Sequence, residues 1–353
     1  MAAGRRGAVR LKTTARATNL TLLVTLVLVF VTGVGAVATG SPSGRWIVIA
    51  HGIAAIVVIL LIPWKTMVIR RGLRRGRPTR WAFLVLALLV VTTLVSGIVS
   101  ATGLVHSVGG FLTLWWHIAI ALALIPLLLW HLVTRPVRLR PLRLRPPTDQ
   151  SRRAMLRVGA IAGGAALAYT LGEVALRVTG APGARRRFTG SHAIASSDPA
   201  AMPMTSWLDD RVPTVDMGQW RLAVIDATGR RELTLAELAA RESTMRATLD
   251  CTSGWYADHE WTGVPVSALV NPSGGDRSLY VHSVTGYWVR LPVEEIGSLL
   301  LAMAVGGQTL SRGHGFPLRL VAPGRRGFWW VKWVDRIELD PTPAWWQPPF
   351  PLT

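Results

Sequence analysis

Cysteine and histidine are the side chains in this sequence with the widest range of chemistry. The 353 residues contain one cysteine, Cys251, in the stretch ATLDCTSG. Disulfides need cysteines in pairs, and the common zinc sites need several cysteines or a cysteine–histidine cluster, so a lone cysteine argues against both. A single thiol can instead act as a reactive or metal-bound thiolate, or pack as a small apolar side chain. The cysteine by itself leaves both interpretations open.

Two histidines lie inside long apolar segments. His51 falls about five residues into the segment 46–64, and His117 falls at a similar depth in the segment 113–133. If both segments are membrane helices entered from the same side, the two side chains can face one another. Imidazoles from facing helices are a suitable axial pair for a b-type haem. The alternative is that each histidine only bonds a carbonyl or polar neighbour. We expect the haem, because ionisable residues inside a membrane tend to be functional.

A third histidine decides between one haem and two. His131 lies 14 residues after His117, on nearly the same helical face and about 21 Å deeper. The corresponding position in the other segment is Lys65, which offers no second imidazole. We therefore expect one haem, with His131 near the membrane interface. His106, in a connecting loop, is a weaker candidate ligand.

Five apolar segments are available to position these histidines. The first four are each about 20 residues long, enough to cross ~30 Å of hydrocarbon as a helix, and the fifth is shorter. The segments are residues 19–39, 46–64, 81–101, 113–133 and 158–176.

Charge is distributed unevenly along the chain. Residues 188–353 contain 14 basic and 17 acidic side chains, a net charge of −3, whereas the whole chain carries +20, so residues 1–187 carry +23. The basic residues cluster before the first apolar segment, between the second and third, and after the fourth, as in cytoplasmic loops of membrane proteins. This placement argues against a nucleic-acid-binding surface. It predicts a multi-pass protein of the cytoplasmic membrane with its C-terminal domain outside the cytoplasm.

The fifth segment has the features of an export signal. SRRAMLR, which contains Arg152 and Arg153, precedes the small-residue apolar run VGAIAGGAALAYTLG, and the combination resembles a twin-arginine signal. That pathway moves folded domains, often with a cofactor already inserted. We expect residues 1–150 to form a four-helix transmembrane domain, residues 151–187 the signal-like fifth helix and linker, and residues 188–353 an oxidoreductase domain.

Residues 188–353 have the pattern of a strand-rich α+β domain with one core. Only two stretches, LTLAELAAR and VEEIGSLLLAMAV, look helical. The strand-like stretches are separated by turn residues. They are WRLAVID, SLYVHSV, YWVRLP, PLRLVAP and WVKWVDRIEL.

Four separated blocks in this half resemble the sulfite oxidase family of molybdenum enzymes. They are, in the family's order, MRATLDCTSGWYADHEWTGVPVSALV, YVHSVTGYWVRLPVEEI, AVGGQTL and HGFPLRLVAPGRRGFWWVKWVDRIEL. The resemblance implies a molybdopterin-binding domain in which Cys251 ligates molybdenum through its thiolate, a soft and strongly donating ligand. One thiol is then enough, because the pterin dithiolene supplies the other sulfurs. The resemblance thus favours the thiolate interpretation of Cys251.

The same resemblance implies cofactor-binding residues. His314 and Arg319 of HGFPLR and Lys332 of VKW match the family's pterin contacts, where cationic and bidentate donors suit phosphate and ring heteroatoms. For Arg319 and Lys332 the alternative is ordinary charge on a strand face. GSHAIASSD resembles an early cofactor-binding stretch, which makes His192 a further candidate. Two other histidines have no such match and are expected at the surface or behind the site: His259 and His282.

One departure from the family bears on the substrate. Sulfite-oxidising members carry basic residues shortly after the cysteine, whereas here TSGWYADHEW follows it. This stretch supplies acidic side chains and Tyr256, which with Cys251 is a candidate catalytic residue. The composition suits a neutral or extended substrate better than a dianion. A basic residue from elsewhere, such as Arg290 or Arg325, would change that expectation.

Together these features predict an outward-facing membrane oxidoreductase with a molybdenum–molybdopterin cofactor and a b haem. Its expected reaction is the reduction of a small or protein-borne S- or N-oxide, as in family members that repair methionine sulfoxide with a separate haem subunit. Quinol or another membrane electron carrier would supply the electrons, and lipid, but not nucleic acid, is the expected surroundings. The alternatives are a sulfite or other oxidase passing electrons to the membrane, and a non-catalytic binding module on a plain anchor.

Overall fold

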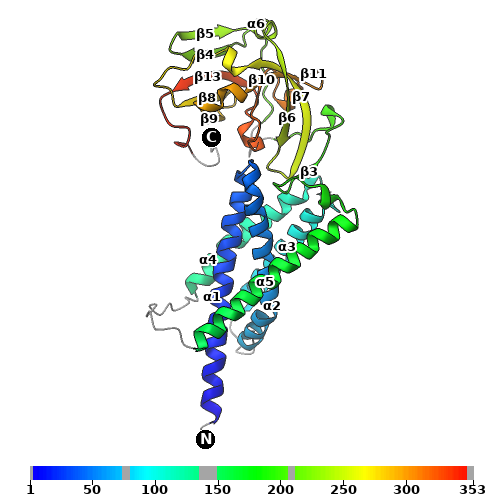
Figure 1. Cartoon of the computed structure of the whole chain (residues 1–353), viewed down its shortest axis with the longest axis vertical. Helices are drawn as coiled ribbons and strands as arrows, with labels where there is room; N and C mark the ends of the chain where they lie inside the picture. The colour runs from blue at the N-terminus through cyan, green and yellow to red at the C-terminus, as the bar shows by residue number, and fades with distance from the viewer. Residues whose placement is uncertain (1–2, 74–79, 135–148, 206–210, 348–353) are drawn as a thin grey trace. The chain divides into compact units, whose positions relative to one another are not determined.

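The chain is described here by a computed structural model that covers residues 3–73, 80–134, 149–205 and 211–347 (Figure 1). Two compact units are present. One consists of residues 1–36 and 43–190 and is helical, and the other consists of residues 37–42 and 191–353 and is strand-rich. The two units are described separately.

The helical unit forms a helix over each apolar segment that the sequence predicts. The helices are α1 Ala3–Ala38, α2 Arg45–Leu73, α3 Arg80–Thr102, α4 Thr113–Thr134 and α5 Asp149–Val178. Within the described residues, all five are long and apolar enough to cross a membrane. Many of their large apolar side chains point outward, Val31 and Leu88 among them. Short 3₁₀ turns at Pro42–Gly44 and Pro182–Arg185 and a small hairpin complete the unit; the hairpin strands are β1 Ser107–Val108 and β2 Phe111–Leu112.

The first sheet of the strand-rich unit is built on one long strand. β7, Trp255–Pro265, alternates buried and less buried side chains along its first half, because successive residues of a strand face opposite sides of the sheet. β6 is antiparallel to β7 along its whole length, and β3 pairs with β7 in parallel. β10 pairs with the other end of β7 and with two short strands. The partners are β3 His192–Ala193, β6 Ser243–Asp250, β10 Leu300–Val305, β11 Gln308–Thr309 and β12 Arg319–Val321.

The second sheet has five strands in the order β5-β4-β13-β8-β9. β4 and β13 run parallel, and every other pairing is antiparallel. The strands are β4 Leu222–Asp226, β5 Gly229–Leu233, β8 Ser278–Ser283, β9 Trp288–Pro292 and β13 Val334–Asp340. Four of these five strands lie in strand-like stretches of the sequence, and β5 was not predicted; the strand-rich character of the C-terminal half is confirmed.

One of the two predicted helices of this unit is correct and the other is wrong. α6, Leu235–Ala239, begins with a capping box between Thr234 and Glu237. In VEEIGSLLLAMAV, by contrast, only Val293–Ser298 coils, as a 3₁₀ helix, and β10 follows at once. Almost all the side chains of β10 are buried, on both faces of the strand, so its continuous apolar run mimics a buried helix. The remaining 3₁₀ turns are Pro199–Ala201, Val266–Ala268, Arg312–His314 and Gly327–Trp329.

Candidate functional site

Cys251 lies in a tight turn between β6 and β7. Its N–H donates to the carbonyl of Trp255 at 2.8 Å, and the N–H of Gly254 donates back to the carbonyl of Cys251 at 3.1 Å. Gly254 has φ +94°, which side chains rarely tolerate. The Cys251 residue is only 7% exposed. The Ser253 hydroxyl lies 3.0 Å and the Thr205 hydroxyl 3.4 Å from its Sγ, so both can donate to a thiolate.

A buried network of hydrogen bonds and one ion pair stabilises this turn. Arg326 donates to the carboxylate of Asp250, the residue before the cysteine, and to the carbonyl of Cys251 at 3.1 Å. The Ser191 hydroxyl donates to the same carboxylate at 2.7 Å. All of these residues are buried. The network therefore fixes the backbone on both sides of the cysteine.

Arg319 is a second buried cation, and its charge interacts with the Cys251 side chain. Burial lowers the pKa of Arg319 to about 10, while the nearby Cys251 side chain acts to raise it. One guanidinium nitrogen donates to the carbonyl of His314 at 3.0 Å. Nε is buried and has no hydrogen-bond partner in the described part of the chain. The guanidinium lies over the rings of Trp261 and Trp330. Arg319 thus retains an unused donor near the cysteine.

His314 and Lys332 tie the segment before residue 206 to the same site. Lys332 Nζ donates to the carbonyls of Thr205 at 2.6 Å and Gly313 at 2.7 Å. His314 contacts the Met202 carbonyl through Nε2 at 3.1 Å and the Ser311 hydroxyl through Nδ1 at 2.8 Å. Burial, followed by the charge of Arg319, lowers the pKa of His314. Its ring is therefore neutral near pH 7, which lets one nitrogen act as an acceptor.

His192 and Tyr256 lie where β3 joins β7. The parallel pairing sets His192 opposite Trp255 and Ala193 opposite Tyr256. The N–H of His192 donates to the carbonyl of Gly254 at 2.9 Å, in the turn that carries the cysteine. His192 is buried, and Tyr256 is half-buried opposite Asp250 of β6. The structure thus brings both predicted residues to the cysteine turn.

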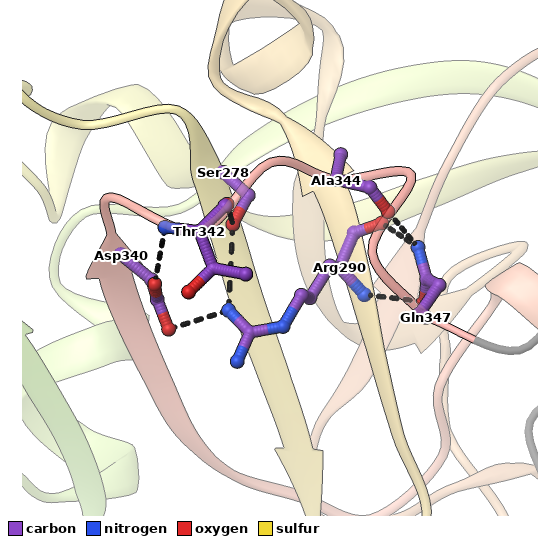
Figure 2. A network of polar contacts seen from close by, with 6 residues as sticks. All are labelled: Ser278, Arg290, Asp340, Thr342, Ala344 and Gln347. Atoms are coloured by element: carbon purple, nitrogen blue, oxygen red, sulfur yellow. Dashed lines mark hydrogen bonds and ion pairs between the residues drawn. The ribbon is translucent and has the colours of Figure 1, made fainter.

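Both arginines that the sequence offers as further cationic residues are paired with carboxylates. Arg290 contacts Asp340 at 2.5 Å, and its backbone is bound by the side-chain amide of Gln347 (Figure 2). Arg325 is paired with Glu295. Neither is therefore an uncompensated positive charge that would attract a dianion.

The remaining two histidines of the strand-rich unit, His259 and His282, make no contact with the cysteine turn among the interactions of the described residues. His259 is buried on β7, and its Nε2 has no partner in the described residues. Burial lowers the pKa of His259, and the carbonyl of Ala195 offsets part of that effect. His282 pairs with Asp335 at 2.9 Å.

In the helical unit, His51 and His117 come together. Their ring centroids lie 6.2 Å apart, with an angle of 88° between the ring planes. His51 Nδ1 lies 3.0 Å from the carbonyl of Val29 on α1, and His117 Nδ1 lies 2.9 Å from the carbonyl of Thr93 on α3. Each Nε2 has no hydrogen-bond partner in the part of the chain that the structure describes.

The other sequence features of this unit lie elsewhere. His131 packs edge-on against Phe83 at 5.2 Å, and His106 is exposed in the loop before α4. Arg152 and Arg153 are in the first turns of α5, and their side chains lie outside the described residues. Most of the predicted basic loops also fall there, at residues 74–79 and 135–148.

No group of three or more histidine, cysteine, aspartate or glutamate side chains suited to a metal occurs among the described residues. A metal bound at Cys251 must therefore bring other ligands with it, as a dithiolene cofactor does. The buried, unused Nε of Arg319 supplies a donor near the cysteine, and the carbonyl of His314 holds the Arg319 guanidinium. The residues present fit a molybdopterin cofactor.

The network of Ser191, Asp250 and Arg326 was not anticipated from the sequence. Asp250 adjoins the cysteine and Arg326 lies in the APGRRG stretch, but in a sequence both look like surface charge. An acidic residue directly before a lone cysteine was the available signal. Thr205 contacts Sγ of Cys251 from 46 residues earlier in the chain, and no sequence feature indicated this contact.

Comparison with known proteins agrees with the geometry of this unit. Residues 209–346, which include Cys251, match the family model described as "Oxidoreductase molybdopterin binding domain". The chain is 38% identical over 175 residues to mitochondrial sulfite oxidase of Homo sapiens, covering 38% of this chain and 32% of that protein. It is 29% identical over 142 residues to the uncharacterised oxidoreductase YuiH of Bacillus subtilis, covering 37% and 72%.

A further relative carries the name of a protein-methionine-sulfoxide reductase subunit, YedZ1, from Azospira oryzae. It is 29% identical over 136 residues, which cover 36% of this chain and 52% of that protein. The chain thus spans only about a third of human sulfite oxidase and about half of this subunit.

Proposed function

We propose that this chain, whose residues 209–346 form an oxidoreductase domain of the molybdopterin-binding type, is a membrane-bound, outward-facing reductase of S- or N-oxides. The observation that carries the proposal is the buried thiol of Cys251 beside the unused donor of Arg319, without a protein-built metal cage among the described residues. The bound molybdenum cofactor would supply the two-electron chemistry.

The protein's own part is to hold and tune that cofactor. The Cys251 thiolate provides one soft ligand, and the hydroxyls of Ser253 and Thr205 can donate to its sulfur. The Arg319 guanidinium, the Lys332 ammonium and His314 would hold the anionic pterin group, and His192 lies next to the cysteine turn. Because the cysteine turn is bonded on both sides, its sulfur is held in place before the cofactor arrives.

A neutral substrate is favoured over sulfite by the charges around the site. Arg290 and Arg325 are compensated by carboxylates, so neither adds an unpaired positive charge. A sulfoxide or amine oxide needs no net positive pocket, whereas a dianion does. Similarity to human sulfite oxidase makes sulfite oxidation, with electrons passed to the membrane, the second candidate.

We propose a b haem between His51 and His117 as the entry point for electrons. A carbonyl accepts only a proton donor, so Nδ1 of each ring carries the proton and Nε2 is left as a ligand. A metal–nitrogen bond of about 2 Å plus about 1.2 Å to the ring centre would place two axial imidazole centroids about 6.4 Å apart. The observed 6.2 Å supports this assignment. The haem would pass single electrons from quinol towards the molybdenum site.

Orientation in the membrane rests on the sequence. Basic stretches in alternate connections between the apolar segments favour an N-terminus in the cytoplasm and a domain after α5 outside it. A reporter fused after Thr353 should therefore be active only if exported. Replacing Arg152 and Arg153 with lysine should block export; unimpaired export would remove the twin-arginine part of the proposal.

The central experiment compares the purified chain with its Cys251→Ser variant. We expect about one molybdenum per wild-type chain and reduction of methionine sulfoxide with a reduced artificial dye. The variant should keep its folded domain, judged by tryptophan fluorescence, and lose turnover. Full activity of the variant would overturn the thiolate assignment. Turnover of sulfite with an oxidised dye, and none of sulfoxides or amine oxides, would favour the second candidate.

A further inference from the structure

The two helix pairs α1–α2 and α3–α4 hold their histidines with the same set of contacts. On α1, His51 Nδ1 meets the carbonyl of Val29 at 3.0 Å and the hydroxyl of Thr32 at 3.3 Å. On α3, His117 Nδ1 meets the carbonyl of Thr93 at 2.9 Å and the hydroxyl of Ser96 at 3.3 Å. In both pairs the hydroxyl residue follows the carbonyl residue by three positions.

A glycine directly after each hydroxyl residue makes room for the ring. A Cβ at Gly33 would lie 3.2 Å from Cε1 of His51, and a Cβ at Gly97 would lie 2.9 Å from Cε1 of His117. The second contact is closer than real Cβ atoms come, so a side chain at Gly97 would displace the ring. The same three-part pattern, a carbonyl, then a hydroxyl, then a glycine, is therefore present twice, once for each histidine.

The hydroxyl protons are directed away from the imidazoles. Thr32 donates to the carbonyl of Leu28 on its own helix at 2.6 Å, and Ser96 donates to the carbonyl of Thr93 at 2.9 Å. Each hydroxyl oxygen therefore faces its histidine as an acceptor. Together with the carbonyl, it accepts the Nδ1–H, which fixes the tautomer and the rotation of the ring.

We propose that these two patterns are a duplicated positioning device that presents both imidazoles to one haem with their planes perpendicular. The inference rests on the haem of the proposed function and adds how its ligands are set. Val29, Thr32 and Gly33 position His51, and Thr93, Ser96 and Gly97 position His117. Because each set lies on the neighbouring helix, each ring's plane is fixed by a different helix, and the observed angle between the planes is 88°.

Perpendicular ligand planes have a spectroscopic consequence. Parallel imidazoles interact with the same iron d orbital and split the d-orbital pair, which gives a rhombic electron paramagnetic resonance spectrum with three resolved features. Perpendicular imidazoles act on the two orbitals equally and leave them nearly degenerate. The ferric haem should then show a single prominent low-field feature with a large g value.

Removing the acceptors should also change the haem potential. An acceptor on Nδ1–H increases the electron donation of the imidazole and so stabilises ferric iron. Thr32→Val and Ser96→Ala should each keep the haem and raise its midpoint potential. The matched controls are Thr25→Val and Thr92→Ala, whose hydroxyls bond only carbonyls of their own helices.

The glycines are tested through the ring planes. Gly97→Ala should shift the low-field resonance or lower the amount of bound haem, because its Cβ meets the His117 ring. Gly163→Ala on α5 is the control, since a Cβ there meets nothing within 4 Å.

The experiment uses the full chain in detergent, expressed with ample haem, and records optical and resonance spectra with a redox titration. A large-g signal, higher potentials in Thr32→Val and Ser96→Ala and unchanged controls would support the device. A low-spin haem with a rhombic signal would contradict the proposed positioning of the histidines but not the presence of haem. Equal midpoint potentials in the wild type and all hydroxyl variants would do the same. Absence of haem from the wild-type chain would instead overturn the haem of the proposed function.

Discussion

Arg326 donates to the carboxylate of Asp250 inside the strand-rich unit, where both side chains are almost entirely buried. Asp250 ends β6 and directly precedes Cys251, and Arg326 also donates to the carbonyl of Cys251 at 3.1 Å. The pair therefore joins a stable sheet to the turn that carries the thiol. The Asp250–Arg326 pair therefore restrains the position of Cys251, on which the proposed chemistry depends.

Breaking this pair should destabilise the unit strongly. Asp250→Asn leaves the Arg326 charge buried without its counter-charge, for which a loss of about 3–5 kcal/mol is expected. Asp258→Asn is the matched control, because Asp258 pairs with Arg246 at 3.1 Å on the exposed side of the same strand pair. Its effect should stay below about 1 kcal/mol. Denaturant unfolding followed by tryptophan fluorescence measures both, and equal losses would contradict the role given to the buried pair.

Arg319→Lys should lower cofactor retention without unfolding the unit. Lysine keeps the charge but not the planar donors, and the unused Nε of Arg319 is the donor that we assign to the cofactor. Molybdenum per purified chain should fall, while the unfolding midpoint changes little. Arg246→Lys, at an exposed position, controls for the substitution itself. Unchanged molybdenum in Arg319→Lys would remove that residue from the cofactor site.

His259 should make the strand-rich unit less stable in mild acid. Burial lowers its pKa from the ordinary 6.5 in the folded state. Below pH 6.5 the unfolded chain therefore takes up a proton at His259 that the folded chain does not. As the pH decreases, the free energy of unfolding falls by up to about 1.4 kcal/mol per pH unit. In His259→Gln the fall between pH 7 and 5.5 should be smaller. The comparison uses the slope rather than the absolute stability; parallel slopes for the two proteins would show that another group is responsible.

Gln347 should protect one backbone amide at the edge of the second sheet. Its Oε1 accepts from the N–H of Arg290 at 3.0 Å, and its Nε2 donates to the carbonyl of Arg290 at 2.7 Å, as a neighbouring strand would (Figure 2). In Gln347→Ala the amide of Arg290 should exchange hydrogen faster. The amides of Val289 and Leu291 face β8 instead and should change little. Equal acceleration at all three positions would indicate loosening of the whole strand.

The elements were predictable where pattern and environment agree. The apolar segments form helices, and stretches such as WRLAVID and SLYVHSV form strands, because local periodicity and burial point the same way. VEEIGSLLLAMAV failed because β10 is covered on both sides, which removes the alternation that identifies a strand.

The candidate site was predictable only in part. Cys251, His314, Arg319 and Lys332 were selected through the family resemblance, and the structure brings them to one region. The buried hydrogen-bond network that holds the cysteine turn was not predictable, because Ser191 and Arg326 are 135 residues apart and meet only in the folded structure. In the helical unit the depths of His51 and His117 suggested a pair, but the acceptors at Nδ1 depend on helix packing, which periodicity does not specify.

The parallel pairing of β4 with β13 has a consequence for biosynthesis. Ala223 sits beside Arg336, so the middle of the second sheet joins residues made early in the unit with residues made near its end. While the ribosome is still translating, the β4–β5 and β8–β9 hairpins expose the strand edges that β13 later covers. Arg319 and Lys332 also emerge late. Cofactor insertion must therefore follow release of almost the whole chain, and a nascent chain stalled before β13 has neither a closed sheet nor a site to load.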